Sequence, residues 1–554
     1  MDGFFNNNNN MKFIKYIILF FSLNLFAQNT IGIINNDAIN SYNGYTLLAP
    51  LSSTETYLIN NCGQVVNQWS STFTPGASVY LLQNGNLLRT GKIINDDITF
   101  GGVGGKLELY DWDGNLLWEY THSSSEISQH HDIYPMPNGN ILMIAVDTMT
   151  ESEAIDAGRD PSKIQEGKIF NEQILELEPI GTNQVNIVWE WNIKDHLIQD
   201  FDSDKANYGV VADNPQLLDF NYISNINDLG NANWLHINSI QYNSDLDQIV
   251  ISTRNLNEIY IIEHTDSTLD AQGQDGGAYG KGGDFLYRWG NKASYDFASL
   301  VDRTLVGQHN PHWIPEALTD ADKIMIFNNG NIAELLYSTV DIIDPPQISA
   351  GFYEFDAVTG YGPEIAEWRY IAPNPTDFYS AILSSGQRLP NGNTLICDGD
   401  SGYFFEIDTN NNKVWEYINP VSNLGILSQG DTPSANLVFR AIKYSPDYTA
   451  FDGRDLTPSN PIELNFDLSS CQLLSIDEYS ISDNVSIYPN PTSDMISLST
   501  ELNIDKIEIF NVYGKLILSE RNQKTISLKN ISTGIYFMKF YSDGKFGNKK
   551  FIKQ

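Results

Sequence analysis

The chain has 554 residues, of which 41% are hydrophobic and 12% aromatic. It is therefore too long for one ordinary domain and too apolar to be disordered throughout. Its formal net charge is −37 and its pI is near 4.3, so it repels nucleic acids and anionic membrane surfaces, and neither is expected as a partner. The segment from Lys506 to Lys553 is rich in lysine, and such a charge step is typical of a domain boundary.

The N-terminal sequence predicts a removable export signal. The Asn run at the very start has no packing logic, so Met11 is the expected start of the natural chain. Lys12 and Lys15 then precede an apolar stretch from Tyr16 to Phe26. This stretch is too short to span a bilayer comfortably, which favours a signal peptide over a membrane anchor. We expect residues 1–28 to be removed and the mature chain to have no transmembrane segment.

Three cysteines are present: Cys62, Cys397 and Cys471. They form no CxxC pair, so the sequence does not support a zinc site or a thioredoxin-like site. An export route would permit a disulfide between Cys62 and Cys471, which bracket the large central region. The alternative is that all three are unpaired, partly buried thiols.

One short pattern recurs through the central region: an apolar strand, the sequence Asn-Gly-Asn, and a second apolar strand. An Asn-Gly pair supplies the positive φ angles of a tight hairpin turn, so each copy predicts a hairpin. The copies are Asn84-Gly85-Asn86, Asn138-Gly139-Asn140, Asn329-Gly330-Asn331 and Asn391-Gly392-Asn393.

A strand with a tryptophan follows each hairpin, and six such positions occur: Trp69, Trp118, Trp189, Trp289, Trp368 and Trp415. Each unit therefore has about four strands, and the region from 29 to 475 has about six units. Four-stranded units repeated around a ring describe an all-β propeller. A stack of β-sandwich domains is the alternative, but the regular pattern of turn and tryptophan makes the propeller the better interpretation.

The C-terminal segment, residues 476–554, has its own pattern. Short alternating runs separated by turn residues predict a small β-sandwich. The order of YPNPT (488–492), IFNVYGK (509–515), GIYFMKF (534–540) and KKFIKQ (549–554) resembles the C-terminal sorting domain of the type IX secretion system. The resemblance implies that the type IX machinery is a partner. It also implies export through the periplasm to the cell surface or the medium.

Five of the eight histidines lie just upstream of predicted hairpins in three of the units: His130, His131, His236, His309 and His312. The innermost strands of a propeller converge on one axis, so we expect these side chains to meet at one mouth of the channel. The remaining three are expected at the surface or in loops: His122, His196 and His264.

Arg254 directly follows the apolar strand 249–253, in the same unit as His236. In so acidic a chain, an arginine beside several histidines makes a local anion site, and its planar fork suits sulfate or phosphate. A surface ion pair is the alternative. Histidine clusters also bind zinc, copper or iron, but no paired spacing with a carboxylate stands out, so no metal is predicted. Calcium has weak support from Asp398-Gly399-Asp400 and from Asp320 with Asp322.

From about Gly44 to Ala450 the sequence resembles the family of bacterial aryl-sulfate sulfotransferases. The segments that carry this resemblance are His130–Asp132, Pro137–Asn140, Trp234–Ser239, Ile251–Arg254, Gln308–His309, Phe327–Gly330, Phe378–Ser380 and Leu389–Leu395. The resemblance implies a six-bladed propeller that moves a sulfuryl group from a phenolic sulfate donor to a phenol acceptor. It implies a histidine nucleophile and no nucleotide or other cofactor.

Carried over residue by residue, the resemblance makes His236, His309 and Arg254 the expected catalytic residues, as sulfate-binding or acid/base groups. The expected substrate-binding residues are His131, Asn238, His312 and Tyr403.

Two departures from the family pattern matter. Residues 331–334 hold no arginine after the Asn-Gly turn, and Tyr403 stands where the last unit should supply the nucleophilic histidine. Either His309 or His236 then takes the nucleophile role, or transfer activity is lost. The alternative function is a non-catalytic surface propeller that binds a glycan, a peptide or a sulfated ligand.

Overall fold

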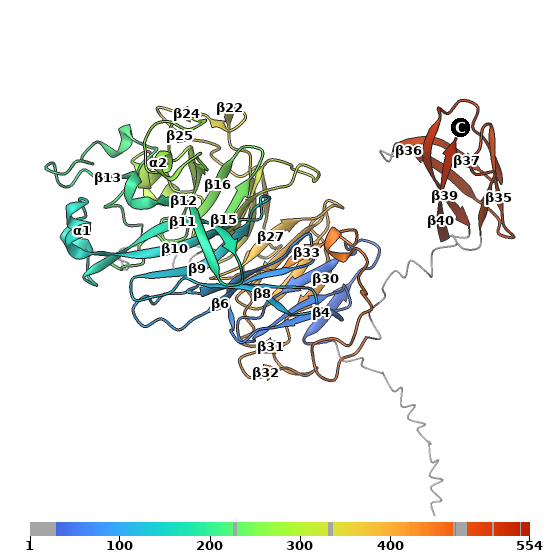
Figure 1. Ribbon diagram of the computed structural model, residues 1–554, viewed down its shortest axis with the longest axis horizontal. Helices are drawn as coiled ribbons and strands as arrows, with labels where there is room; N and C mark the ends of the chain where they lie inside the picture. The colour runs from blue at the N-terminus through green and yellow to red at the C-terminus, as the bar shows by residue number, and fades with distance from the viewer. Residues whose placement is uncertain are drawn as a thin grey trace, which may run out of the picture.

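The computed structural model describes residues 29–224, 230–330, 336–468, 471, 485–511, 515–542 and 545–554. The predicted signal peptide and the predicted domain boundary at 475/476 lie outside these ranges. Regular structure is almost entirely β-strand, in a large body and a C-terminal unit of its own (Figure 1). The described part of the chain contains no helix that is both long and apolar enough to cross a membrane.

The large body is built from four-stranded antiparallel meanders, and the described strands form six of them. The first contains β33 (Ile442–Tyr444), β2 (Tyr45–Leu48), β3 (Glu55–Ile59) and β4 (Val65–Ser70). The second contains β5 (Pro75–Leu81), β6 (Leu87–Lys92), β7 (Gly105–Tyr110) and β8 (Leu116–Thr121). The third contains β9 (Ile127–Pro135), β10 (Ile141–Thr150), β11 (Lys168–Ile180) and β12 (Gln184–Asn192).

The remaining meanders follow in chain order. The fourth contains β15 (Ile237–Asn243), β16 (Gln248–Thr253), β17 (Glu258–Glu263) and β18 (Tyr287–Trp289). The fifth contains β19 (His309–Trp313), β20 (Ile324–Asn328), β21 (Thr339–Ile343) and β26 (Trp368–Tyr370). The sixth contains β27 (Ser385–Arg388), β28 (Thr394–Asp398), β29 (Tyr403–Ile407) and β30 (Lys413–Ile418), with β1 (Gly32–Asn36) on its outer edge.

The loops between these strands contain only short elements. The helices are α1 (Glu151–Asp156), α2 (Thr268–Ala271) and the 3-10 turns Pro161–Lys163, Ile193–His196, Val211–Asp213, Lys292–Tyr295, Leu300–Asp302, Pro375–Asp377 and Thr449–Phe451. The short strands are β13 (Leu197–Ile198), β14 (Leu218–Asp219), β22 (Gln347–Ser349), β23 (Phe352–Tyr353), β24 (Phe355–Asp356), β25 (Gly360–Tyr361), β31 (Val421–Ser422) and β32 (Gly425–Ile426).

The first strand of each meander lies beside the first strand of the next, and together these strands form a closed ring. The backbone N–H of Asn310 on β19 donates to Oγ of Ser239 on β15 at 2.7 Å. The ring closes where Gln387 on β27 exchanges two hydrogen bonds of 2.8 Å with the backbone of Lys443 on β33. Meanders around such a ring are the blades of a propeller, which confirms the predicted fold class.

Three of the predicted Asn-Gly-Asn turns are tight connections between the first two strands of a blade. Their glycines have positive φ angles: 86° at Gly85, 91° at Gly139 and 88° at Gly392. At Asn329-Gly330 the flanking strands do form an antiparallel hairpin, β20 with β21, but their connection is not a tight turn, because β20 ends at Asn328 and β21 begins only at Thr339. The Asn329 amide is instead buried, where it bonds to backbone carbonyls and to a histidine described below.

The predicted tryptophans lie in the fourth strand of each blade, counted from the axis, and connect it to the blade that follows. The indole N–H of Trp69 on β4 donates to the Asp111 carbonyl of the second blade at 2.8 Å. In the last blade the indole of Trp415 donates to the Asn61 carbonyl of the first blade, also at 2.8 Å. These outer contacts therefore run around the ring in the same sense as the inner ones.

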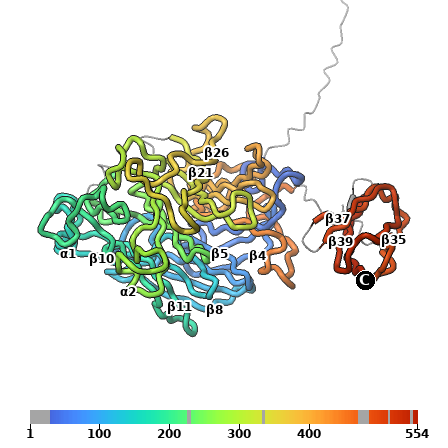
Figure 2. Tube along the Cα trace, turned by 90° about the horizontal axis from the view of Figure 1, so that it is seen from above, coloured from blue at the N-terminus to red at the C-terminus, as the bar shows by residue number. Residues whose placement is uncertain are grey.

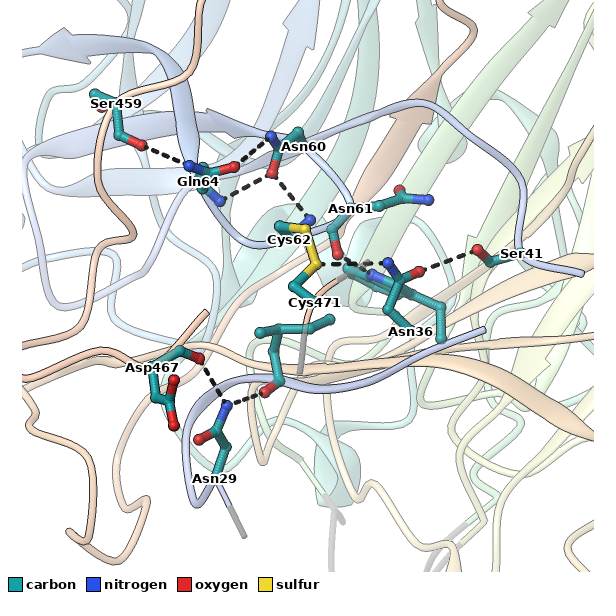
Figure 3. The surroundings of a disulfide bond; sticks show 12 residues. Asn29, Asn36, Ser41, Asn60, Asn61, Cys62, Gln64, Ser459, Asp467 and Cys471 are labelled. Atoms are coloured by element: carbon teal, nitrogen blue, oxygen red, sulfur yellow. Dashed lines mark hydrogen bonds between the residues drawn. A yellow bond between two sulfur atoms is a disulfide. The ribbon is translucent and has the colours of Figure 1, made fainter. Parts of the chain in front are cut away.

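The N-terminal strand of the body joins the last blade, and the C-terminal strand joins the first blade. β1 pairs with β30 of the last blade, and β33 supplies the innermost strand of the first blade. Close to this closure Cys62 and Cys471 form a disulfide with their Cα atoms 5.7 Å apart (Figure 3). Of the two alternatives for the cysteines, the structure has the bridge, and Cys397 is a buried free thiol.

The C-terminal unit has two facing sheets, and Figure 2 shows it in red. One sheet contains β34 (Ser486–Tyr488), β35 (Met495–Ser499) and β38 (Thr525–Ser527). The other contains β37 (Leu516–Arg521), β36 (Lys506–Asn511), β39 (Gly534–Ser542) and β40 (Lys545–Lys553). Apolar side chains of both sheets, among them Ile496, Ile509 and Met538, share one core, as the predicted β-sandwich requires.

Candidate functional site

The histidines of interest stand where the innermost strands begin. In four blades one residue at this place has a left-handed backbone: His131 (φ 48°), His236 (φ 57°), Asn310 (φ 53°) and Ser384 (φ 89°). In the third, fourth and fifth blades, which hold His131, His236 and Asn310, the strand register also shifts here, so each innermost strand carries a bulge. Such a bulge redirects side chains, and strained non-glycine residues concentrate at functional sites.

His131 and His236 lie against one another, with ring centroids 4.6 Å apart. The ring of Phe100, from the loop between β6 and β7, lies 5.9 Å from His236 and 6.3 Å from His131. The neighbouring Gly102 approaches so closely that a Cβ there would overlap the His131 ring, so only glycine fits. This loop therefore covers the two histidines from one side.

His130 holds His131 from behind and is itself fully buried. Its Nδ1 lies 2.9 Å from Nδ1 of His131, and its Nε2 lies 2.9 Å from a carboxylate oxygen of Glu172. The other oxygen of Glu172 accepts from the backbone N–H of Ile237 at 3.0 Å, on the strand that follows His236. His130 therefore positions His131 through its bond to Glu172 and is not expected to contact substrate.

His309 has one ring nitrogen fixed by two acceptors. Its Nδ1 lies 2.7 Å from Oδ1 of Asn329 and 3.1 Å from the Gly307 carbonyl. The amide of Asn329 is itself oriented, because its NH₂ group donates to the carbonyls of Ser380 and Leu383, each at 3.0 Å. Nδ1 must therefore carry the hydrogen, which leaves the Nε2 lone pair of the neutral ring available.

Arg254 is close to all three histidines. Its backbone N–H donates to the His236 carbonyl at 3.1 Å, and its guanidinium would lie 3.9 Å from a Cβ placed on Gly307. Burial, followed by the charge of Arg254, lowers the pKa of His309 to about 3. Burial also lowers the pKa of His131 and His236 well below the usual value, and the Arg254 charge adds to this. At neutral pH the cluster has neutral imidazoles beside a cation.

Three other predicted site residues are not brought to this cluster. Asn238 is fully buried, and its NH₂ group donates to the Gln308 carbonyl at 2.8 Å, which joins β15 to β19. His312 lies further along β19 and lines a separate cavity. The hydroxyl of Tyr403 bonds to Glu416 and accepts from Lys413, on strands β29 and β30 away from the axis. Residues 331–334, where an arginine was looked for, lie outside the described ranges.

The three histidines expected at the surface or in loops are better anchored than predicted. His122 and His196 lie in the connections after β8 and β12, as predicted, but not at the surface: His122 is 5% exposed, and His196 is fully buried, where its Nδ1 lies 2.7 Å from Asp284. His264 is partly exposed and lies 2.9 Å from carboxylate oxygens of both Glu176 and Asp247. Charged or stacked partners explain this burial, and the sequence spacing gave no sign of them.

Two residues of the site were missed or misread. Asn329 was read as a turn residue, although it orients His309. Tyr379 lies within range of the Arg254 charge, and in the described part of the chain its buried hydroxyl has no hydrogen-bond partner. Tyr379 lies in the Phe378–Ser380 segment, which carries part of the family resemblance, but the resemblance assigned no role to it.

The acidic turns considered for calcium are engaged by the protein itself. The two carboxylate oxygens of Asp320 pair with Lys323 at 3.3 Å and with Arg388 at 2.7 Å. Asp398 accepts from the backbone N–H of Ser401 at 3.3 Å. Among the described residues no group of three or more His, Cys, Asp or Glu could hold a metal ion. The calcium suggestion stays a prediction.

The fold and the site together define a class: an all-β propeller with neutral histidines and one arginine where its inner strands begin. A family model described as arylsulfotransferase (ASST) matches residues 51–425, and the chain belongs to this family. A second model, described as a secretion system C-terminal sorting domain, matches residues 486–554. The protein is therefore exported, either to the cell surface or into the medium.

Solved structures with a similar trace are only distantly related. A protein of unknown function from Bacteroides caccae is 10% identical, with coverage of 73% of this chain and 99% of that one and a TM-score of 0.38. The virginiamycin B lyase from Staphylococcus aureus is 12% identical, with coverage of 72% and 86% and a TM-score of 0.32. The periplasmic gluconolactonase of Pseudomonas aeruginosa is 8% identical, with coverage of 73% and 97% and a TM-score of 0.33. These matches say nothing about activity, and no curated protein matches the chain.

Proposed function

We propose that this protein is an exported aryl-sulfate sulfotransferase with its reaction centre at His131, His236, His309 and Arg254. Membership of the arylsulfotransferase family supports the reaction class. The observation that carries the proposal for this chain is the fixed tautomer of His309. Asn329 and the Gly307 carbonyl hold the hydrogen on Nδ1, so the Nε2 lone pair is available without prior loss of a proton.

In the first half of the reaction, the Nε2 lone pair of His309 forms a bond to the sulfur of the donor. The bond between sulfur and the phenolic oxygen breaks, and its electron pair leaves on the phenolate. The sulfuryl group is then attached to Nε2. The other hydrogen of the ring stays on Nδ1 and remains hydrogen-bonded to Asn329. The positive charge that develops on the ring is offset by the negative sulfuryl group and by the oxygens around Nδ1.

In the second half, the oxygen of the acceptor phenol attacks the sulfur, and the bond to Nε2 breaks with its pair returning to nitrogen. The proton lost by the acceptor balances the proton taken up by the phenolate that left. No nucleotide or other cofactor enters this balance.

Arg254 and His236 are suited to hold the sulfate oxygens. Arg254 offers planar donors and a positive charge in an otherwise acidic protein. The NH₂ group of Asn233 lies 2.6 Å from Nδ1 of His236, and in this arrangement the hydrogen of the neutral imidazole is on Nε2. A neutral donor of this kind stabilises charge on the transferring oxygens without repelling Arg254.

The proposal is tested by transfer from 4-nitrophenyl sulfate to phenol with the full exported chain. We expect His309→Ala and His236→Ala each to lower kcat/KM at least about tenfold, the low end for a positioned acid/base group. His122→Gln, a buried histidine outside the cluster, is the matched control and should retain activity. Intact mass after mixing with donor alone should show one added sulfuryl group in the wild type and none in His309→Ala.

A wild type no faster than the His236→Ala/His309→Ala double variant would exclude the transfer reaction. The non-catalytic alternative would then be favoured, and it predicts that aryl sulfate binds without product formation. An adduct that persists in His309→Ala would move the nucleophile role to His236 or His131.

A further inference from the structure

A cavity with a volume of about 210 Å³ lies on the propeller axis. Every innermost strand contributes to its wall. One residue from each strand represents the lining: Tyr80 on β5, Tyr134 on β9, Gln241 on β15, Trp313 on β19, Gln387 on β27 and Ile442 on β33. The cavity therefore belongs to the central channel of the propeller.

This cavity is separate from the histidine cluster. The cluster residues stand where the innermost strands begin, whereas the cavity is lined by residues further along the same strands, such as Tyr134 and Trp313. Of the described residues that line it, none is His131, His236, His309 or Arg254. The cavity and the histidine cluster thus lie at successive levels along the same inner strands.

Arg440 lies between the cavity and the cluster. It lines the cavity, and its charge also lowers the pKa of His309. Its guanidinium donates to the Tyr80 hydroxyl and to the buried carboxylate of Asp132, each at 2.7 Å. In the orientation that satisfies both of its polar atoms, the Asn310 amide also accepts from Arg440 at 3.3 Å. The positive charge here is consequently neutralised by the Asp132 carboxylate.

The cavity has a lining that suits one aromatic ring. Tyr134 and Trp313 supply aromatic surface, and Ile240, Leu318 and Ile442 supply aliphatic surface. An apolar cavity of about 150 Å³ is enough to hold benzene, and drug-sized ligands need at least about 300 Å³. The volume therefore fits a single ring with a small substituent.

His312 gives this cavity one directed polar contact. Its Nδ1 lies 3.0 Å from the Asn310 carbonyl, so Nδ1 carries the hydrogen and donates. Nε2 of the neutral ring is then an acceptor, and within the described residues no donor is paired with it. A neutral acceptor in a mainly apolar pocket, whose two arginines Arg388 and Arg440 are paired with Asp320 and Asp132, favours a neutral ligand with a hydroxyl group over an anion.

We propose that this cavity is a binding site for a small neutral phenol, whose ring packs against Tyr134 and Trp313 and whose hydroxyl donates to Nε2 of His312. The anionic aryl sulfate is held at the cluster, beside Arg254. This deepens the proposed function by giving the phenol a holding place outside the reaction centre, before it attacks as acceptor or after it leaves as product, and in that respect alone it rests on that function. Binding of the phenol needs no transfer step.

The test is equilibrium binding of 4-fluorophenol to the full chain without donor, followed by ¹⁹F NMR. 4-Fluoroanisole has the same ring but no hydroxyl hydrogen, and we expect it to bind at least about fivefold more weakly, the effect of one lost hydrogen bond. His312→Leu should weaken 4-fluorophenol by a similar factor and 4-fluoroanisole hardly at all. His312→Gln keeps an acceptor and should restore part of the difference.

Controls separate this site from the cluster. His236→Gln should leave 4-fluorophenol binding unchanged, and phenyl sulfate should not displace it. Equal affinity for the two fluorinated probes would overturn the proposal without any variant, and so would loss of binding in His236→Gln or competition by phenyl sulfate. Phenol binding that depends on His312 in a chain without transfer activity would support this site and reject only the proposed function.

Discussion

At the scale of single residues, Asn329 determines what His309 can do. Its amide is held by two backbone carbonyls, so it presents an oxygen and not an NH₂ group to Nδ1. The ring nitrogen that faces the site is therefore the one with a lone pair. A positioning residue of this kind acts through the tautomer of another residue and needs no contact with substrate.

Removal of that acceptor should lower the rate of transfer more than the affinity for the donor. We expect Asn329→Leu to reduce kcat about tenfold with little change in KM, because only part of the His309 population then has its hydrogen on Nδ1. Asn329→Asp retains an acceptor and should recover most of the rate. In the His309→Ala background Asn329→Leu should cost nothing further, and an additive loss would contradict the positioning role.

The buried, cation-flanked histidines also predict the pH dependence of the reaction. A base whose pKa is lowered to about 3 is almost wholly unprotonated from about pH 5 upward. The logarithm of kcat/KM for an aryl sulfate donor should therefore be flat from about pH 5 to pH 7, and the acid limb should lie below pH 5. An inflection near pH 6.5, where an ordinary histidine titrates, would show that His309 is not the reacting group.

At the scale of elements, the blades are connected by specific side chains as well as by packing. His264, which follows β17 of the fourth blade, reaches Glu176 on β11 of the third blade and Asp247 of its own. Burial lowers the pKa of His264, but the hydrogen bonds to the two carboxylates outweigh it and raise the pKa to about 9. The protonated ring is therefore a charged link between two blades.

This link should make stability depend on pH in a defined window. The folded pKa of about 9 exceeds the unfolded value of 6.5, so the contribution is complete below about pH 6.5 and is lost as the pH rises toward 9. The shift corresponds to roughly 3 kcal/mol at most. Denaturant unfolding should show a smaller decline between pH 6 and pH 9 in His264→Gln than in the wild type or in His122→Gln. Equal slopes in all three would contradict the link.

The elements themselves were largely predictable, and the reason is local. Gly85, Gly139 and Gly392 adopt positive φ in tight turns whose geometry depends on a few neighbouring residues. The same Asn-Gly-Asn sequence does not form a tight turn at Asn329. Its amide instead bonds to the Ser380 carbonyl and to His309, which are distant in the sequence, and no local pattern indicates such partners.

The candidate site was predictable in composition but not in geometry. The sequence pattern indicated that His131, His236 and His309 meet near the starts of inner strands, and that Arg254, directly after the second strand of the His236 blade, lies beside them. It could not show the left-handed residues and bulges that decide which side chains face each other. His312 shows how far a prediction from spacing can be wrong. It lies only three residues after His309 on the same strand, but it lines the separate cavity and not the cluster.

At the scale of the whole molecule, the disulfide joins the first blade to the residue at which the described propeller ends. It closes a loop of almost the entire body, which restricts the unfolded chain strongly. The Cys62→Ser/Cys471→Ser double variant should lose about 2–5 kcal/mol and melt a few degrees lower. Cys397→Ser removes a thiol outside the bridge and serves as the control.

Reducing agent should lower the Tm of the wild type and of the control but not that of the double variant. If the oxidised wild type and the double variant melt together, the bridge does not stabilise the closed ring.

The pairing of β33 with β2 has a consequence for the order in which the protein is made. Synthesis and export deliver the chain from its N-terminus, so the central blades have all their strands long before the first blade obtains its innermost one. The first blade stays incomplete until nearly the whole body has emerged, and its exposed strand edge must be kept from pairing wrongly during that interval. Final assembly of this propeller is therefore a late, long-range event.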